Sequence, residues 1–375
     1  MRLRLILCVL LIACRPVAKS DSLTSSMNSA PGSQAIIQSR IVDNSTVLLR
    51  SRTTVIPGGQ SLRTLNFTND KTGWIGSSTG VIYKTSDGGG SWQRMLVPAD
   101  PNIYVSSIYF ADEVNGWAIL AKNASDVMNS SGYESEVQHT NDGGINWQRQ
   151  YFGSKLQIAR IQFLNKQEGW VTGRNLEKGA FVLHTTDEGR HWTDATGNLS
   201  TDYGTDVTPL GPGIARLVTA RGNVLLTNDS GSSWHQVEAL QGEPLQSRIS
   251  KIGITPSGGL WFLGGTDSKE GVWTTLAARP STGETLNYRL NGVHLLDAIF
   301  LGDSQIVAGG SMVSDPDESE ETRKAVILYS KDGGSIWTVA YENKDIGKFN
   351  ALVRQGNNLW AVGDHGLIVR LESRF

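Results

Sequence analysis

Five aspartates occupy the same place in five copies of one eight-residue phrase, Ser/Thr-x-Asp-x-Gly-x-x-Trp. Carboxylates are common general acids, bases and metal ligands, so these positions are the first candidates for chemistry. Each phrase, however, holds one Asp between two short β-type runs, a setting that is typical of a hairpin turn. There the carboxylate accepts hydrogen bonds from turn amides and the glycine supplies a positive φ. We therefore interpret all five as structural turn residues, with no metal or catalytic role: Asp87, Asp142, Asp187, Asp229 and Asp332.

Seven polar residues form a second recurring set, each three positions before the end of a run in which apolar and less apolar residues alternate. This alternation has the period of a β-strand. If the runs are the inner strands of one ring, the seven residues lie at similar height near its axis. Two interpretations stay open, namely salt bridges between neighbouring repeats and a polar axial pocket for a small ligand or a partner's side chain. The set is Thr64, Ser107, Arg160, Asp206, Lys251, Asp297 and Asn350.

The repeats that carry both sets recur about every 40–50 residues, a period that is typical of propellers and solenoids. We count seven repeats: the first four and the sixth hold a box phrase, and the fifth holds a degenerate version at Gly271-Val-Trp273-Thr. The last repeat stops before a fourth strand, which the segment Thr46–Ile56 can supply. The sequence therefore predicts an all-β fold, a seven-bladed β-propeller with Asp-box hairpin turns whose ring is closed by an N-terminal strand.

Composition narrows the function classes. The 34 Lys and Arg residues nearly balance the 36 Asp and Glu residues, which gives a formal net charge of −2 and argues against nucleic-acid binding. The six histidines are scattered, and no glycine-rich phosphate loop or Ser/His/Asp arrangement stands out. We expect neither cofactor nor metal, and we expect a monomer.

The amino terminus has the form of a bacterial lipoprotein leader. A basic stretch, Met1–Arg4, precedes the apolar run Leu5–Ala13, which is too short to span a bilayer, and Leu11-Ile-Ala-Cys14 resembles a lipobox. We predict a signal peptide over 1–13, a lipidated Cys14 with a flexible tether over 14–44, and the propeller over 45–375. An ordinary signal peptide with a coincidental cysteine is the alternative. The prediction puts the protein in the bacterial cell envelope, exported and lipid-anchored, on the periplasmic or lumenal side.

The box phrase resembles the repeat of Asp-box, or BNR, propellers. Together with the leader and the phrases of the form Gly-Trp…Gly-x-Ile/Leu-x-x-Thr-x-Asp-Gly-Gly-x-x-Trp, the chain over about Ser61–Phe375 is similar to the photosystem II assembly and stability factor family. That resemblance implies a seven-bladed, lipid-anchored, non-catalytic propeller that binds protein partners at the membrane surface.

Sialidases share the Asp box, so a carbohydrate-active enzyme of sialidase or other glycoside hydrolase type is the alternative function. Sialidases carry a Phe-Arg-Ile/Leu-Pro phrase, an arginine triad, an acid Asp and a Tyr–Glu pair, and the first of these is missing here. Arg50 and Arg52 stand in a different context. Tyr341 and Glu342 are adjacent, and neighbours on a strand point to opposite faces. We therefore predict that the chain is not an enzyme.

Two long insertions, Lys122–Glu136 and Ser311–Lys324, each fall between the second and third strands of a repeat. Strand direction reverses at every hairpin, so both must emerge on the rim opposite the box turns. Loops on a rigid scaffold often carry recognition. We expect the acidic run of the second insertion to meet a protein partner, with a plain solvated loop as the alternative: Asp315, Asp317, Glu318, Glu320 and Glu321.

Overall fold

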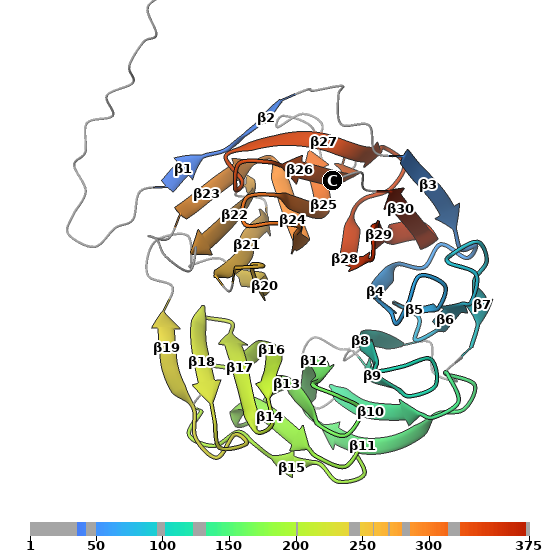
Figure 1. The fold of residues 1–375 in the computed structure, drawn as a ribbon, viewed down its shortest axis with the longest axis vertical. Coiled ribbons are helices and arrows are strands. Elements are labelled where there is room, and N and C mark those ends of the chain that lie inside the picture. The colour runs from blue at the N-terminus through green and yellow to red at the C-terminus, as the bar shows by residue number, and fades with distance from the viewer. Residues whose placement is uncertain are drawn as a thin grey trace, which may run out of the picture.

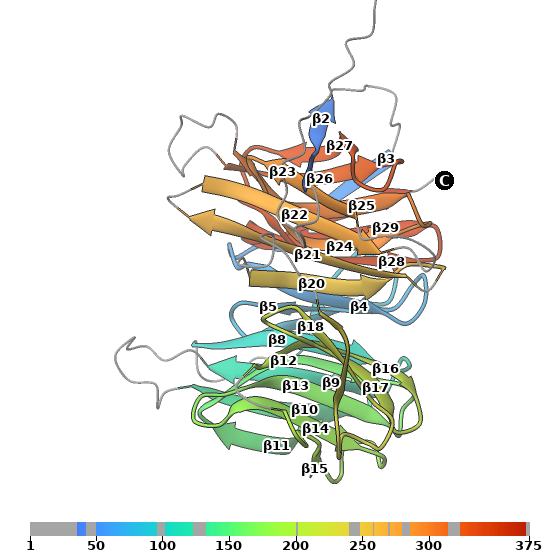
Figure 2. The ribbon, with the colours of Figure 1, turned by 90° about the vertical axis from the view of Figure 1, so that its left-hand side faces the viewer.

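Seven sheets are arranged around a central axis, and each sheet is one blade (Figure 1). The structure is a computed structural model that describes residues 36–42, 50–95, 102–122, 133–199, 202–239, 248–257, 259–268, 271–279, 286–313 and 323–372. Figure 2 shows the ring from the side, with the strands running between its two rims. The all-β, seven-bladed architecture expected from the sequence is confirmed.

Four strands follow one another from the axis outward in each blade. Blades 1 and 2 contain β4 (Leu62–Phe67), β5 (Gly73–Ser77), β6 (Ile82–Thr85) and β7 (Gln93–Arg94), then β8 (Ile103–Phe110), β9 (Gly116–Lys122), β10 (Glu134–Thr140) and β11 (Gln148–Ser154). Blades 3 and 4 contain β12 (Leu156–Phe163), β13 (Gly169–Asn175), β14 (Gly179–Thr185) and β15 (Thr193–Asp194), then β16 (Gly204–Gly211), β17 (Ile214–Thr219), β18 (Asn223–Thr227) and β19 (His235–Ala239).

The second half of the ring follows the same plan. Blades 5 and 6 contain β20 (Arg248–Ile254), β21 (Leu260–Ser268), β22 (Gly271–Arg279) and β23 (Leu286–Asn291), then β24 (Val293–Phe300), β25 (Ile306–Val313), β26 (Arg323–Ser330) and β27 (Ile336–Asn343). Blade 7 contains β28 (Phe349–Gln355), β29 (Asn358–Gly363), β30 (Leu367–Glu372) and, from the other end of the chain, β3 (Arg50–Val55). The fourth strand of blade 7 thus comes from the segment that the sequence indicated, paired antiparallel with β30.

Each box phrase forms the turn between the third and fourth strands of its blade. In the first box the Thr85 hydroxyl donates to Asp87 Oδ1 at 2.8 Å and accepts the Gly89 N–H at 2.8 Å. The same Oδ1 accepts the Ser91 N–H at 3.0 Å. Gly89 has a φ of 80°, a backbone conformation that would be strained for any residue with a side chain. The other four boxes repeat this pattern of bonds, so the box residues stabilise a turn.

A Gly-Trp pair begins the second strand of blades 1 to 3. In the first blade Gly73 lies opposite Phe67, and a Cβ on that glycine would come within 2.5 Å of the phenylalanine ring. The glycine therefore leaves room for the aromatic ring of its own blade. The tryptophan beside it, Trp74, turns instead to the next blade, where it stacks on Phe110 with ring centroids 3.6 Å apart.

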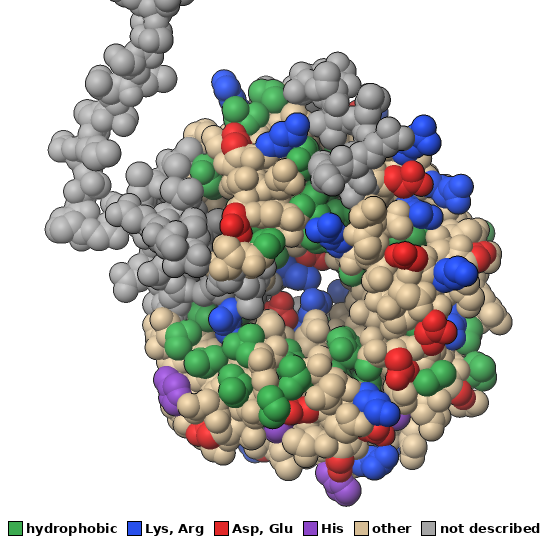
Figure 3. Space-filling view, viewed as in Figure 1, with side chains coloured by type: hydrophobic (Ala, Val, Ile, Leu, Met, Phe, Trp, Pro, Cys, Tyr) green, Lys and Arg blue, Asp and Glu red, His purple; other side chains and the backbone are tan. Residues whose placement is uncertain are grey.

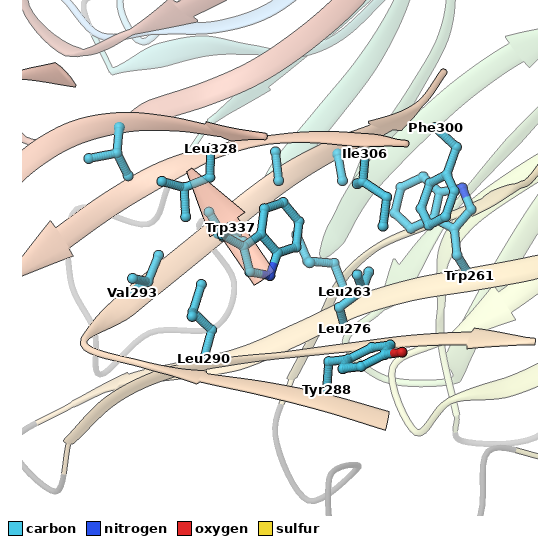
Figure 4. Packing of buried hydrophobic residues seen from close by; sticks show 14 residues of the cluster. Trp261, Leu263, Leu276, Tyr288, Leu290, Val293, Phe300, Ile306, Leu328 and Trp337 are labelled. Atoms are coloured by element: carbon cyan, nitrogen blue, oxygen red, sulfur yellow. The ribbon is translucent and has the colours of Figure 1, made fainter. Parts of the chain in front are cut away.

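We call the interface between neighbouring blades a seam. A full seam holds three rings: the second-strand Trp of one blade, the Phe that ends the inner strand of the next, and the box Trp of that next blade. The seam between blades 5 and 6 shows the arrangement with Trp261, Phe300 and Trp337 buried in one cluster (Figure 4). Because each blade buries its apolar face against its neighbour, the core is a series of seams around the ring.

The segment 36–42, which the sequence suggested was tether, adds strands to two outer blade edges. Strand β1 (Ile36–Gln38) pairs parallel with β23, and β2 (Arg40–Val42) pairs parallel with β27. Between them the buried Ser39 donates its N–H to the Arg289 carbonyl at 2.8 Å and its hydroxyl to the Gly334 carbonyl at 2.6 Å. The prediction was wrong here because unsatisfied outer edges accept a passing extended segment. We call 36–42 the strap.

A second expectation also needs correction. The degenerate box placed at Gly271-Val-Trp273-Thr is part of β22, the third strand of blade 5, with no turn there. Trp273 instead lies under the Arg289 guanidinium, 4.3 Å from its ring centroid. The apparent match arose because a lone tryptophan in a glycine-rich stretch mimics the end of a box phrase.

Candidate functional site

A polar cavity of about 260 Å³ lies on the axis of the ring. Inner strands from six of the seven blades contribute to its wall, and Figure 3 shows the central opening with basic and acidic side chains inside it. We call it the axial cavity. Its polar lining is Arg63, Thr64, Asn66, Ser106, Tyr109, Arg160, Gln162, Lys251, Asp297 and Asn350.

A β-bulge in every inner strand sets which side chains reach the axis. The pairing of the inner and second strands skips one residue in each blade, for example between Leu62 and Thr64 in blade 1 and between Ile158 and Arg160 in blade 3. A bulge bends the strand and re-aims the side chains beside it. The residues after the bulge are therefore those of the recurring polar set in blades 1 to 6.

Two ion pairs join neighbouring blades near the axis. Arg160 Nε lies 3.3 Å from Asp206 Oδ1, and Lys251 Nζ lies 3.2 Å from Asp297 Oδ1. The first is an ionic contact, not an aligned hydrogen bond, because the Nε–H finds no acceptor in the right direction. Asp297 is buried and also accepts the Leu352 N–H of blade 7 at 2.9 Å. The alternating charges thus form the inter-blade pairs of the first interpretation.

Five of these residues also line the axial cavity, and its role as a pocket for a ligand or a partner's side chain stays a prediction. Of the predicted set, Thr64, Arg160, Lys251, Asp297 and Asn350 reach the cavity wall. The other two do not: the buried Ser107 accepts the Ile161 N–H, and Asp206 forms the ion pair with Arg160.

Blade 7 departs from the predicted register by one residue. Its β28–β29 hairpin is tight, with Gln355 opposite Asn358, so the inner strand runs past its expected end. Asn350 consequently occupies the bulge position, and Ala351 is the counterpart of Thr64. Asn350 still faces blade 1, where its side-chain amide donates to the Leu62 carbonyl at 2.9 Å.

Sequence reasoning missed Arg63, the bulge residue of blade 1. Its guanidinium lies 4.7 Å from the centroid of the Tyr104 ring, and no described carboxylate lies within ion-pair distance of it. With Arg63 the lining holds three cations against one carboxylate, so the cavity is electropositive. No recurring pattern pointed to Arg63, because the residues at the bulge positions of the other blades are not basic.

A glycoside hydrolase needs two carboxyl groups about 5–10 Å apart. Of the described residues that line the cavity, Asp297 alone carries a carboxylate, and Lys251 neutralises it. The sialidase-like residues lie on outer strands: Arg50 and Arg52 on β3, and Tyr341 and Glu342 on β27. Tyr341 and Glu342 have partners there, since Tyr341 Oη contacts Thr53 Oγ1 at 3.2 Å and Glu342 Oε2 accepts from Lys324 Nζ at 2.6 Å.

Hydrogen bonds within the turn lower the pKa of the carboxylates in four of the boxes, those of Asp87, Asp142, Asp187 and Asp229. Hydrogen bonds from the backbone N–H and side chain of Ser91 lower the pKa of Asp87 to about 2, and the His191 N–H has the leading part in lowering the pKa of Asp187 to about 2. Within the described ranges, no group of three or more His, Cys, Asp or Glu side chains is placed to hold a metal ion. Nor does any helix in that part of the chain have the length and apolar character to cross a membrane.

Two predicted features lie outside the described residues. Cys14 precedes Ile36, the first residue that the structure describes. The acidic run from Asp315 to Glu321 falls in the gap between β25 and β26. The flanking strands do place the connections β9–β10 and β25–β26 on the rim opposite the box turns, because strand direction reverses at each hairpin.

Comparison with solved structures shows similar folds. The structure described as "YCF48 bound to D1 peptide" has a TM-score of 0.62 at 18% identity and covers 90% of this chain and 99% of that one. A GH74 xyloglucanase from Xanthomonas campestris reaches a TM-score of 0.55 at 14% identity, with 85% of this chain and 53% of that chain covered. At such identities both comparisons show the shared propeller fold alone.

Comparison of sequences is more specific. The family model described as photosynthesis system II assembly factor YCF48 matches residues 130–243. The photosystem II assembly lipoprotein Ycf48 of Synechococcus sp. (strain CC9902) is 26% identical over 324 residues, which cover 82% of this chain and 83% of the relative. The chloroplastic photosystem II stability/assembly factor HCF136 of Arabidopsis thaliana is 24% identical, with 71% of this chain and 63% of the relative covered. Together with the box turns, these matches show that the chain is similar to the photosystem II assembly factor-like BNR-repeat propellers.

Proposed function

We propose that this protein is an exported, lipid-anchored, non-catalytic propeller that binds a protein partner at the membrane surface. The observation that carries the proposal is the electropositive axial cavity, whose polar wall is assembled from the inner strands of six blades. A relative is named an assembly lipoprotein, and a solved structure of similar fold is described as bound to a peptide.

The shape and charge of the axial cavity favour a segment of a protein chain as the occupant. A volume of about 260 Å³ is below the ~300–1,000 Å³ usual for a small-molecule site, but it accepts one or two side chains of an inserted segment. Arg63 brings a positive charge without a carboxylate partner among the described residues. A carboxylate on the incoming segment would pair with this exposed guanidinium through charge-assisted hydrogen bonds.

The carbohydrate-active alternative has less support. A GH74 enzyme shares the fold, but fold alone does not determine activity. With Asp297 as the one carboxylate on the described cavity wall, the general acid and its partner base or nucleophile are not both present there.

The anchor is tested at Cys14. The Cys14→Ser protein, expressed in a bacterial host, should move from the membrane fraction to the soluble fraction, and the terminal peptide of the wild type should carry the mass of the lipid. A protein that stays with the membrane after the substitution, with no lipid mass on the wild type, would contradict the anchor.

Partner binding is tested by capture from detergent-solubilised host membranes. We expect the wild-type chain to retain a defined set of membrane polypeptides, and Arg63→Ala to lose most of it. Arg190→Ala, which removes an exposed arginine on a box turn, is the matched control and should retain the set. A deletion of residues 314–321 removes the acidic run of the second insertion. We expect this deletion to weaken capture. Full capture by Arg63→Ala would remove the axial cavity from the proposal.

A further inference from the structure

The fourth strand of blade 3 ends early. β15 pairs with β14 at Leu183 and His184, and the next residue, Ala195, adds one bond from its N–H to the Val182 carbonyl at 2.9 Å. In blade 2, by contrast, the fourth strand continues along the third as far as its first residue. Among the described residues, the outer edge of β14 therefore has no strand beside Gly179–Phe181.

The main-chain groups of Ala180 point toward this open edge. In an antiparallel sheet, alternate residues of a strand direct their N–H and C=O to the same side. Val182 uses its pair on the outer side, where its N–H donates to Thr196 Oγ1 at 3.1 Å and its C=O accepts from Ala195. Ala180 stands two residues earlier, so its N–H and C=O point outward beyond the reach of β15. They are the donor and acceptor that an added strand would use.

A groove of about 560 Å³ follows the open edge, between β11 of blade 2 and β14 of blade 3 (Figure 1). Its apolar wall includes Tyr151, Leu156 and Phe181, and the Tyr151 and Phe181 rings lie 6.0 Å apart. Phe152, on the same wall, is 48% exposed. The volume is within the ~300–1,000 Å³ usual for binding sites. Because the groove and the axial cavity have no lining residue in common, they are separate sites.

Opposite charges stand at the two ends of the groove. The exposed Lys178 lies in the turn that leads into β14, and the exposed Asp194 ends β15. Burial raises the pKa of the Tyr151 hydroxyl and the charge of Asp194 adds to the increase, which shows that this carboxylate is close to the aromatic wall. A strand added antiparallel to β14 would begin near Asp194 and end near Lys178.

The ring already completes other outer edges with extended segments from distant parts of the chain. Blade 7 takes its fourth strand, β3, from the amino-terminal part of the chain, and the strap pairs with the edges of blades 5 and 6. The open edge of blade 3 offers the same kind of main-chain pairing to an incoming strand.

We propose that this groove binds an extended segment of a partner protein, which adds as an antiparallel strand beside Gly179–Phe181. Residues of the segment opposite Phe181 and Gly179 face the wall formed by Tyr151 and Leu156, so they are apolar. A basic residue precedes them beside Asp194, and an acidic residue follows them beside Lys178. The groove is thus a second contact for a partner, on the outer wall of the ring, in addition to the proposed axial site.

Two synthetic peptides with blocked termini test this assignment on the full chain carrying Cys14→Ser. The first, Lys-Val-Thr-Val-Glu, has the charges in the favourable order, and the second, Glu-Val-Thr-Val-Lys, has them reversed. Binding is measured by fluorescence polarisation of the labelled peptides. We expect the first peptide to bind about fivefold more tightly, a difference expected when two exposed ion pairs change sign.

Substitutions locate the peptide in the groove. Lys178→Glu should abolish the preference for the first peptide, whereas Lys166→Glu, which reverses an exposed lysine on the opposite rim of blade 3, should retain it. Ala180→Pro removes the outward N–H without removing a bond to β13, so it should weaken both peptides while the urea midpoint stays near that of the wild type. Arg63→Ala should bind the peptides as the wild type does.

Hydrogen exchange reports the added strand directly. In protein labelled isotopically at alanine, the Ala180 amide should exchange about tenfold more slowly when the first peptide is saturating. Ala325, its counterpart in blade 6, should not change, because its N–H already donates to the Ile346 carbonyl at 2.7 Å.

No binding of either peptide, or equal binding of the two, would overturn the proposal. Binding that leaves the exchange of Ala180 unchanged would do the same. Loss of binding in Arg63→Ala would place the peptide in the axial cavity instead. Since the peptides are tested without membranes, these outcomes are independent of the capture experiment.

Discussion

Removing one ring of a full seam should weaken that seam by an amount that the geometry specifies. Trp74 is completely buried, its ring is nearly parallel to that of Phe110 at 3.6 Å, and its indole N–H donates to the Gly143 carbonyl at 3.0 Å. Trp74→Ala should cost about 3–5 kcal/mol from the lost contacts and the cavity. The unpaired Gly143 carbonyl adds a desolvation cost of about 1–3 kcal/mol, which places the loss at the upper end of this range.

A double-mutant cycle isolates the ring pair. Trp74→Ala, Phe110→Ala and the double variant are compared by urea unfolding followed with far-ultraviolet circular dichroism. We expect a coupling of about 0.5–1.5 kcal/mol from the stacked pair. The control cycle combines Trp74→Ala with Phe300→Ala in blade 6, where the two losses should add to within about 0.5 kcal/mol. Additive losses for Trp74 and Phe110 would refute the idea that stacked rings join the blades.

Three further outcomes follow from the same structure. Gly169→Ala should destabilise the fold by about 1–3 kcal/mol, measured by urea unfolding, because its Cβ would lie 2.4 Å from the Phe163 ring; an unchanged midpoint would show that the ring has room to move. Asp187→Ala should cost about 1–2 kcal/mol by leaving turn amides without an acceptor, with Arg190→Ala as a neutral comparison. The pKa of Asp187 is lowered to about 2, so its stabilisation is complete above the unfolded-state pKa near 4 and is lost as pH falls from 4 towards 2. In unfolding experiments across that window, wild type should lose more stability than Asp187→Asn.

The sequence was most informative where one local cause determines the structure. A box turn needs the hydroxyl, the carboxylate and the positive-φ glycine within eight residues, so its signal lies in a single phrase. The Gly-Trp pairs and the alternating inner strands are equally local, and together they led to seven blades. Thr46–Ile56 was found by a different argument, since an incomplete last repeat requires a strand from elsewhere.

Features that depend on distant partners could not be predicted in the same way. The strap consists of two three-residue strands whose pairing is set by blade edges some 250 residues away, as in the contact between Gln38 and Arg289. The axial cavity depends on bulges, which shift the register by one residue without a residue type that marks them. In blade 7 the tight β28–β29 hairpin moved the register, so Asn350 was matched to the wrong neighbours.

The parallel pairing of the strap also constrains the order of folding. Ser39 bonds to a carbonyl that lies 295 residues later in the chain, and β3 pairs with β30 of blade 7. These early segments therefore have no partner until blades 5 to 7 have been made, and such long-range pairing forms slowly. A chain that is exported unfolded can pair its outer strands after translocation is complete. A chain whose synthesis or translocation stops before blade 6 would instead expose unpaired strand edges to other chains.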